Sequence, residues 1–131
     1  MEKRLGAAVW GAGWVAGEHI RAYENNPHCE VVAIGSRKAE SAKKAAEAAG
    51  LECAIYDDYD ELLKDERVDI VSICTPNHLH AQETIKAANA GKHILIEKPV
   101  ALNLEDLTAM RDAVRKAGVK TVVSFVLRWN P

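Results

Sequence analysis

The sequence has few cysteines and almost no net charge. Three cysteines occur, at positions 29, 53 and 74, without a C-x-x-C spacing, and the formal net charge is −2. An odd, scattered set excludes a complete disulfide framework, so we expect reduced thiols that fill the core of a cytoplasmic protein. Without a strong basic field the chain cannot hold a nucleic-acid backbone, and nucleic acid is not expected as a partner.

Long apolar runs are also missing. No stretch approaches the roughly 18 consecutive apolar residues of a membrane span, so no membrane contact is expected. Lys3 and Arg4 precede the run 5–17, which offers a secretory signal as an alternative. That run is rich in alanine and glycine rather than leucine, and its removal would delete the first predicted strand. The chain has no linker, repeat or low-complexity tract, and residues 1–131 are predicted to form one domain.

What the sequence does contain is a regular alternation of short β-branched runs and longer segments of helical spacing. Strands are predicted at 5–10, 30–36, 52–56, 68–75, 92–98 and 119–126, and helices from Trp14 and over 39–50, 58–65, 80–91 and 103–118. Strands that alternate with helices through short connections favour right-handed crossovers. We therefore predict an α/β fold with a doubly wound parallel sheet covered by helices on both faces.

The predicted helices carry end signals and apolar faces. Gly50, Gly91 and Gly118 follow three of them, where a left-handed residue commonly ends a helix. Asn103 and Asp106 resemble a capping pair at the start of the last helix. The residues predicted to form its buried stripe are Leu104, Leu107, Met110 and Val114.

A glycine-rich turn follows the first strand. Gly11 and Gly13 lie between that strand and the helix that begins at Trp14, and Ala16 occupies the third slot of a G-x-G-x-x-A pattern. In this context Gly11 makes the tight turn, Gly13 lets a pyrophosphate approach the main chain, and a small third residue lets helix and strand pack. The free amides of the first helical turn would hold the phosphates of a dinucleotide.

The end of the second strand bears on the choice of cofactor. Ser36, Arg37 and Lys38 occupy the corner where an NAD-binding fold usually places Asp or Glu. A carboxylate would repel a 2′-phosphate, whereas Arg37 can pair with it through charge-assisted hydrogen bonds. The sequence therefore favours NADP over NAD, with solvated surface charges as the structural alternative.

Polar residues also follow the predicted strand at 68–75. Thr75, Pro76, Asn77 and His80 lie where open α/β sheets bind ligands, although Pro76 can also end a strand and Asn77 can cap the next helix. His78 and His80 are two residues apart, but no carboxylate or cysteine completes a metal-ligand pattern, and no metal site is expected.

The strand at 92–98 ends in two charged residues. Glu97 and Lys98 are unusual there because unpaired charges at the end of a buried strand are costly. Desolvation and a neighbouring positive charge, such as an oxidised nicotinamide, can make such a lysine a proton donor and acceptor. A surface salt bridge between Lys98 and Glu97 is the structural alternative.

Taken together, three motifs resemble one family. The amino-terminal domain of the Gfo/Idh/MocA family, named for glucose-fructose oxidoreductase, inositol dehydrogenase and rhizopine catabolism, has similar motifs to GAGWVAGEH (11–19), CTPNHLH (74–80) and EKP (97–99). The resemblance covers essentially the whole chain, and EKP is its most specific element. It implies a three-layer αβα Rossmann fold that binds a nicotinamide dinucleotide. The terminal segment VSFVLRWNP (123–131) resembles the segment by which members leave this domain.

The resemblance also implies roles for single residues. The pyrophosphate would be lined by Gly11, Gly13, Trp14 and Val15, and the adenosine ribose by Ser36 and Arg37. The residues at the strand end that would lie toward the nicotinamide half are Thr75, Pro76, Asn77 and His80. Glu97 would help to orient the cofactor, and Lys98 would also contact it. Lys98 would hydrogen-bond the substrate oxygen and assist proton movement while hydride passes between substrate and nicotinamide. Family substrates are typically sugars, polyols and their derivatives.

Members of the family have a second domain that supplies the substrate pocket and the usual homo-oligomer interface, and this chain ends at Pro131. We therefore expect it to bind cofactor while turning over substrate poorly or not at all, and apolar surface to favour self-association. The alternative from another class is a non-catalytic dinucleotide-sensing or regulatory module. A methyltransferase-like fold that binds an adenosyl cofactor would leave EKP unexplained.

Overall fold

The computed structural model describes residues 2–125 and 128. The strands are β1 (Leu5–Trp10), β2 (Cys29–Gly35), β3 (Ala54–Tyr56), β4 (Ile70–Ile73), β5 (His93–Glu97) and β6 (Thr121–Ser124). The helices are α1 (Trp14–Glu24), α2 (Ala39–Ala49), α3 (Tyr59–Lys64), α4 (His80–Asn89) and α5 (Leu104–Ala117), with a 3₁₀ turn η1 (Asn77–Leu79) before α4. These elements confirm the predicted alternation. Residue 126 of the last predicted strand, and most of the terminal segment after Phe125, lie outside the described residues.

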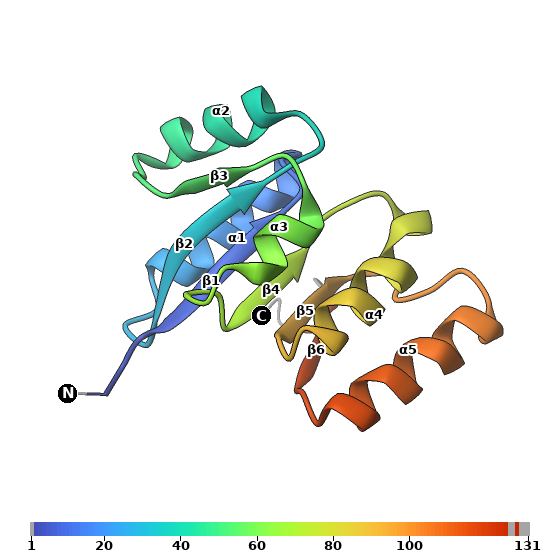
Figure 1. Cartoon of the computed structure of the whole chain (residues 1–131). Helices are drawn as coiled ribbons and strands as arrows, with labels where there is room; N and C mark the ends of the chain where they lie inside the picture. Colours follow the sequence, from blue (N-terminus) through green and yellow to red (C-terminus); the bar gives the residue numbers. More distant parts are fainter. Residues whose placement is uncertain (1, 126–127, 129–131) are drawn as a thin grey trace.

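The six strands form one parallel sheet in the order β3-β2-β1-β4-β5-β6 (Figure 1). The chain runs outward from β1 to β3, crosses back to β4 on the other side of β1, and continues to β6. Trp10, the last residue of β1, lies opposite Gly35 of β2 and Ile73 of β4. The order reverses between β1 and β4, which is where open α/β sheets hold ligands beyond the carboxyl ends of their strands.

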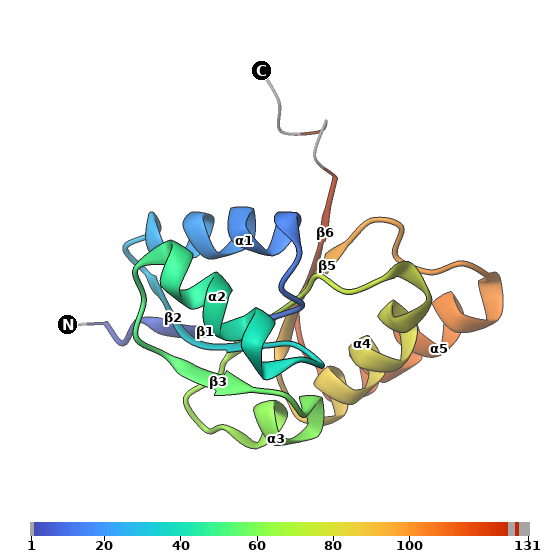
Figure 2. The same ribbon diagram turned by 90° about the horizontal axis from the view of Figure 1, so that it is seen from above.

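Helices cover both faces of this sheet (Figure 2). Ala7 and Val9 of β1 pack in one buried cluster with residues of α1 and α2, and Ala8 and Trp10 pack in another with residues of α3, α4 and α5. Successive side chains of a strand point to opposite faces, so a strand buried on both sides must be apolar throughout. The predicted doubly wound, three-layer fold is therefore confirmed.

The helix ends follow the expected local chemistry at most places. The side chain of Asn103 accepts a hydrogen bond from the backbone N–H of Asp106 at 2.8 Å and so caps α5. Gly50 and Gly118 each have φ of +69° directly after α2 and α5. Gly91 also has a positive φ, but α4 ends at Asn89, two residues earlier than predicted.

The predicted buried stripe of α5 is partly wrong. Leu104 and Leu107 are 76% and 43% exposed, whereas Met110 is buried and Val114 is half-buried. Met110 and Val114 pack into the cluster that α4 and β5 share, so the later part of α5 supplies the contact. Among the described residues, the first turn of α5 finds no apolar partner that buries its leucines. Within residues 2–125 and 128, no helix is long and apolar enough to cross a membrane.

Candidate nucleotide-binding site

Two glycines shape the turn between β1 and α1. Gly11 has φ of +108°, and a Cβ atom on it would lie 2.5 Å from the carbonyl oxygen of Cys74. Gly13 has an ordinary φ of −79°, and a Cβ atom there would meet nothing within 4 Å. Gly11 is thus required by packing and backbone conformation, whereas Gly13 leaves open space beside the main chain. Ala16 is fully buried, as expected for the small third residue of the pattern.

The amino terminus of α1 is open to an anion. Gly13 is the N-cap residue, no described side chain caps this end, and the first turn carries no acidic residue. Helix N-termini have free backbone N–H groups and a partial positive charge, which together favour phosphate groups. Trp14 and Val15 lie at this end because they are the first two residues of α1. Trp14 is 84% exposed and Val15 is half-buried.

The glycine turn forms one wall of a cleft of about 360 Å³. The loops that follow β2 and β4 form its other walls. Residues of the predicted site that line it are Gly11, Gly13, Ser36, Arg37, Thr75 and Pro76. Ser36 is half-buried and Arg37 is exposed at the mouth. Three segments far apart in the sequence therefore meet at the carboxyl edge of the sheet.

A buried carboxyl group that the sequence analysis missed lines this cleft. Glu83 of α4 accepts hydrogen bonds from the Thr75 hydroxyl at 2.6 Å and the Trp10 indole N–H at 3.2 Å. Burial raises the pKa of Glu83, and the bonds from Thr75 and Trp10 oppose that shift. Its bonds fix Thr75 at the cleft wall. The available signal was a glutamate on the inward face of a predicted helix.

Asn77 and His80 follow Pro76 of the cleft wall. Asn77 is exposed in η1, and its side chain caps neither η1 nor α4. The His80 side chain is fully buried, with Nδ1 2.8 Å from the carbonyl oxygen of Pro99 and Nε2 2.9 Å from that of Thr75. The ring of His80 has no exposed surface and bonds two backbone segments, and its place toward the nicotinamide half stays a prediction.

A second hollow, of about 450 Å³, is lined in part by Trp14. Val15 and His19 of α1, Glu97 of β5 and Ser124 of β6 contribute to its lining. Glu97 is buried, and its Oε1 lies 2.7 Å from His19 Nε2. Glu97 thus forms a hydrogen bond with His19, rather than a salt bridge with Lys98 as the structural alternative supposed.

Lys98 directly follows β5 and is exposed rather than desolvated. The peptide bond that joins it to Pro99 is cis. The side chain of Lys98 is therefore accessible to a molecule bound near the end of β5, beside the hollow that Glu97 lines.

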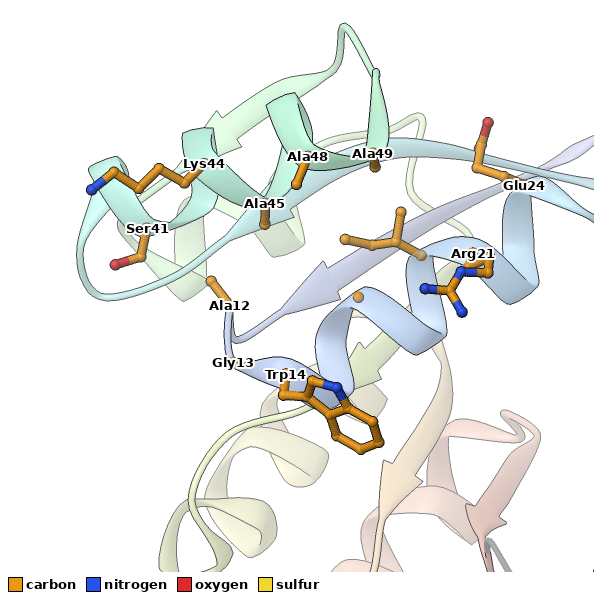
Figure 3. Close-up of a pocket in the computed structure, with 12 residues that line it drawn as sticks. Ala12, Gly13, Trp14, Arg21, Glu24, Ser41, Lys44, Ala45, Ala48 and Ala49 are labelled. Atoms are coloured by element: carbon orange, nitrogen blue, oxygen red, sulfur yellow. The ribbon is translucent and has the colours of Figure 1, made fainter.

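A third hollow, of about 690 Å³ and larger than the other two, lies between α1 and α2 (Figure 3). Ala45, Ala48 and Ala49 of α2 point toward α1 across it. Of the predicted site residues, it includes only Gly13 and Trp14. It follows the sides of two helices instead of the strand ends, so size alone does not identify the site. Within residues 2–125 and 128, no three or more His, Cys, Asp or Glu side chains gather as metal ligands.

Comparison with known proteins agrees with this arrangement. Residues 5–125 match the model of the Gfo/Idh/MocA oxidoreductase family, described as an NAD-binding Rossmann fold. The chain is 35% identical to scyllo-inositol 2-dehydrogenase (NAD⁺) of Bacillus subtilis in an alignment 132 positions long that covers all of this chain and 38% of that protein.

Two solved structures are similar along nearly the whole chain. The WlbA dehydrogenase of Bordetella pertussis, in complex with NADH and UDP-GlcNAcA, has a TM-score of 0.90 and 28% identity over 98% of this chain and 39% of that one. The scyllo-inositol dehydrogenase of Lactobacillus casei, with bound NAD(H) and scyllo-inositol, has a TM-score of 0.88 and 25% identity over 98% and 38%.

The chain spans a little over a third of the length of these relatives. The matched part contains the parallel sheet, the glycine turn and the cleft described above. The chain therefore belongs to the Gfo/Idh/MocA oxidoreductase family, and residues 5–125 form its NAD-binding Rossmann domain.

Proposed function

We propose that the dinucleotide lies along the carboxyl edge of β2, β1 and β4, with its pyrophosphate at the amino terminus of α1. The observation that carries this proposal is the single cleft in which the glycine turn, Arg37 and Thr75 meet. Gly13 and the first amides of α1 would hold the pyrophosphate, and Ser36 and Arg37 the adenosine ribose. Trp14 and Val15, at the start of α1, would lie beside the pyrophosphate. Thr75, Pro76 and Asn77 would lie toward the nicotinamide half, where Glu97 would help to orient the cofactor.

Lys98 is the group that we propose for proton transfer. When bound, the dinucleotide supplies a nicotinamide ring that accepts or donates a hydride. The exposed amine of Lys98 would hydrogen-bond the substrate oxygen and take up or give back its proton. The substrate class is proposed to be sugars, polyols or related hydroxy or carbonyl compounds, by analogy with the inositol and sugar-nucleotide ligands in the names of the relatives.

Further parts of the proposal concern the whole protein. Because the relatives are more than twice as long, the matched domain alone is proposed to bind cofactor without efficient turnover. Three free thiols fit a reducing, cytoplasmic location. The exposed Leu104 and Phe125 fit a domain that associates with further protein, including other copies in a homo-oligomer.

Gly13→Ala tests the position of the pyrophosphate. The added methyl group meets no protein atom within 4 Å, so the fold is expected to persist. The same methyl group would occupy the space through which the pyrophosphate approaches the main chain, and dinucleotide affinity is expected to fall at least about tenfold, roughly 1.4 kcal/mol. Calorimetric titration or quenching of tryptophan fluorescence with NADH and NADPH measures the dissociation constants.

Gly17→Ala is the matched control, because it adds a methyl group to open space one turn later in α1. It is expected to leave affinity within about twofold and to stabilise the helix by roughly 0.5–1 kcal/mol. Equal affinities for the Gly13→Ala and Gly17→Ala proteins would place the pyrophosphate elsewhere.

Arg37 tests which dinucleotide is preferred. The names of the relatives described above carry NAD or NADH, so a preference for NADP rests on Arg37 alone. If Arg37 pairs with a 2′-phosphate, Arg37→Ala is expected to weaken NADP binding about 10- to 100-fold and NAD binding less than twofold, because a hydrogen bond to a charged group contributes about 1.5–3 kcal/mol.

Lys38→Ala removes the neighbouring exposed cation and serves as the control for net charge. It is expected to change both affinities by less than about threefold, as screened surface charges do. Tighter binding of NAD than of NADP by the unaltered protein would refute the preference, as would an equal loss of both cofactors in Arg37→Ala.

A further inference from the structure

A buried chain of hydrogen bonds leads from Glu97 across the sheet. His19 Nε2 lies 2.7 Å from Glu97 Oε1, and His19 Nδ1 lies 3.0 Å from Ser72 Oγ. Ser72 Oγ lies 2.8 Å from the hydroxyl of Tyr23. All four side chains are buried, and they come from α1, β4 and β5. The end of β5 is thus connected to two other elements through polar side chains.

The chemistry of these groups fixes the direction of the bonds. A Glu97 carboxylate only accepts, so His19 Nε2 carries the hydrogen of that contact. In a neutral ring Nδ1 then accepts from the Ser72 hydroxyl, and Ser72 Oγ accepts from Tyr23. Burial raises the pKa of Tyr23 to about 12, so its phenol keeps the proton that it donates. Each hydrogen has one acceptor, which holds the His19 ring in one orientation.

A second buried histidine, His80, contacts the backbone on the other side of Lys98. The two contacts of His80 are with the carbonyl oxygens of Thr75 and Pro99, which only accept, and a neutral imidazole has a single N–H, so the ring donates to one of these two oxygens at a time. The contact with Pro99 ties α4 to the residue that follows Lys98, and the contact with Thr75 ties α4 to the loop after β4. The ring itself is fully buried, whereas the two carbonyl groups belong to residues that are partly exposed.

Lys98 therefore lies between two anchored neighbours. Glu97 is bound through its side chain to His19 on the α1 face of the sheet, and Pro99 is bound through its carbonyl to His80 of α4. Lys98 itself is exposed, and lysine has a long side chain with many rotamers. The protein can fix the origin of that side chain only by fixing the backbone around it.

We propose that His19 and His80 are positioning residues that hold the backbone on both sides of Lys98. This inference rests on the proposed proton-transfer role of Lys98. Neither ring needs to touch cofactor or substrate. Misplacement of a reacting group by about 1 Å can lower a rate about 100-fold, so a loop that loses one anchor should lose turnover while its cofactor cleft stays intact.

Paired substitutions in a full-length protein that contains this domain separate positioning from packing. His19→Gln keeps an amide donor near the place of Nε2, whereas His19→Leu fills similar space and leaves Glu97 unpartnered. His19→Leu is expected to lower kcat about 10- to 100-fold with dinucleotide Kd within threefold, and His19→Gln to recover most of the loss.

At the second anchor, His80→Asn keeps a donor near Nδ1 toward Pro99, and His80→Gln keeps one near Nε2 toward Thr75. The asparagine variant is expected to retain the higher kcat.

Hydrogen exchange at residues 97–101 provides a readout independent of turnover. It is expected to accelerate in His19→Leu and to return toward the original rate in His19→Gln. Ser72→Ala is a smaller change that removes the bond to His19 Nδ1, and it provides the test if His19→Leu does not fold. It is expected to lower kcat about three- to tenfold. Equal kcat for the Leu and Gln variants, or unchanged kcat and exchange in Ser72→Ala, would overturn the inference.

The proposed function fails by a different result. Absence of dinucleotide binding by the unaltered protein, or full activity of Lys98→Ala, would refute that function without any histidine variant. If both of those tests succeed and the histidine pairs show no difference, only the positioning inference is wrong.

Discussion

Lys98→Ala in a full-length protein that contains this domain is expected to lower kcat about 10²- to 10⁴-fold. Loss of a positioned proton donor and acceptor removes roughly 3–5 kcal/mol of transition-state stabilisation. The dissociation constant of the dinucleotide is expected to stay within about threefold, because Lys98 lines neither the cleft at the glycine turn nor the hollow beside Glu97. Steady-state kinetics combined with cofactor titration separates these two quantities.

Lys116→Ala is the matched control, since Lys116 is exposed in the last turn of α5. It removes the same charge on a different element and is expected to leave kcat within twofold. If Lys98→Ala also retained kcat within about threefold, the proton-transfer role would be lost. The alternative of a non-catalytic module that senses dinucleotides would then be the better account.

Gly11→Ala is expected to destabilise the domain severely. The new side chain would adopt a φ of +108°, which costs about 1–3 kcal/mol, and would place Cβ 2.5 Å from the backbone oxygen of Cys74. Relieving that overlap by moving β1 away from the loop after β4 costs about 1–3 kcal/mol more. Thermal unfolding is expected to show a fall of more than about 10 °C in Tm, because a loss of this size is a large part of a typical domain's stability.

Gly50→Ala separates conformational strain from steric overlap. Gly50 also has a positive φ, of +69°, but a Cβ atom on it would meet nothing within 4 Å. It is expected to cost only about 1 kcal/mol, and Tm should fall by roughly 3–5 °C. If the Gly11→Ala and Gly50→Ala proteins melted at the same temperature, close approach to Cys74 would not be the reason for glycine at position 11.

Local signals in the sequence were sufficient to predict the fold. The apolar strands, the glycines after α2 and α5, and the Asn103 cap depend on residues close together in the chain, and each was correct. The cleft was also predictable in outline, because all parallel strands end at the same edge. Ser36 and Thr75 follow two of those strands, and both lie in the cleft with the glycine turn.

Contacts between distant segments could not be predicted from spacing. Glu97 was expected either to orient cofactor or to pair with Lys98, but its partner His19 lies 78 residues away. A histidine on the inward face of α1 and a carboxylate at a buried strand end were the only available signals. The exposed Leu104 has the opposite cause, since helical periodicity gives an apolar stripe without showing what covers it.

The strand order has a consequence for how the domain is made. β1 lies between β2 and β4, so the first strand synthesised acquires its second neighbour only when residues 70–73 have left the ribosome. Thr75 and the other residues after β4 that line the cleft leave the ribosome later still. A coenzyme that needs both walls is thus a late ligand of the nascent chain, and we expect its binding to slow unfolding more than it hastens folding.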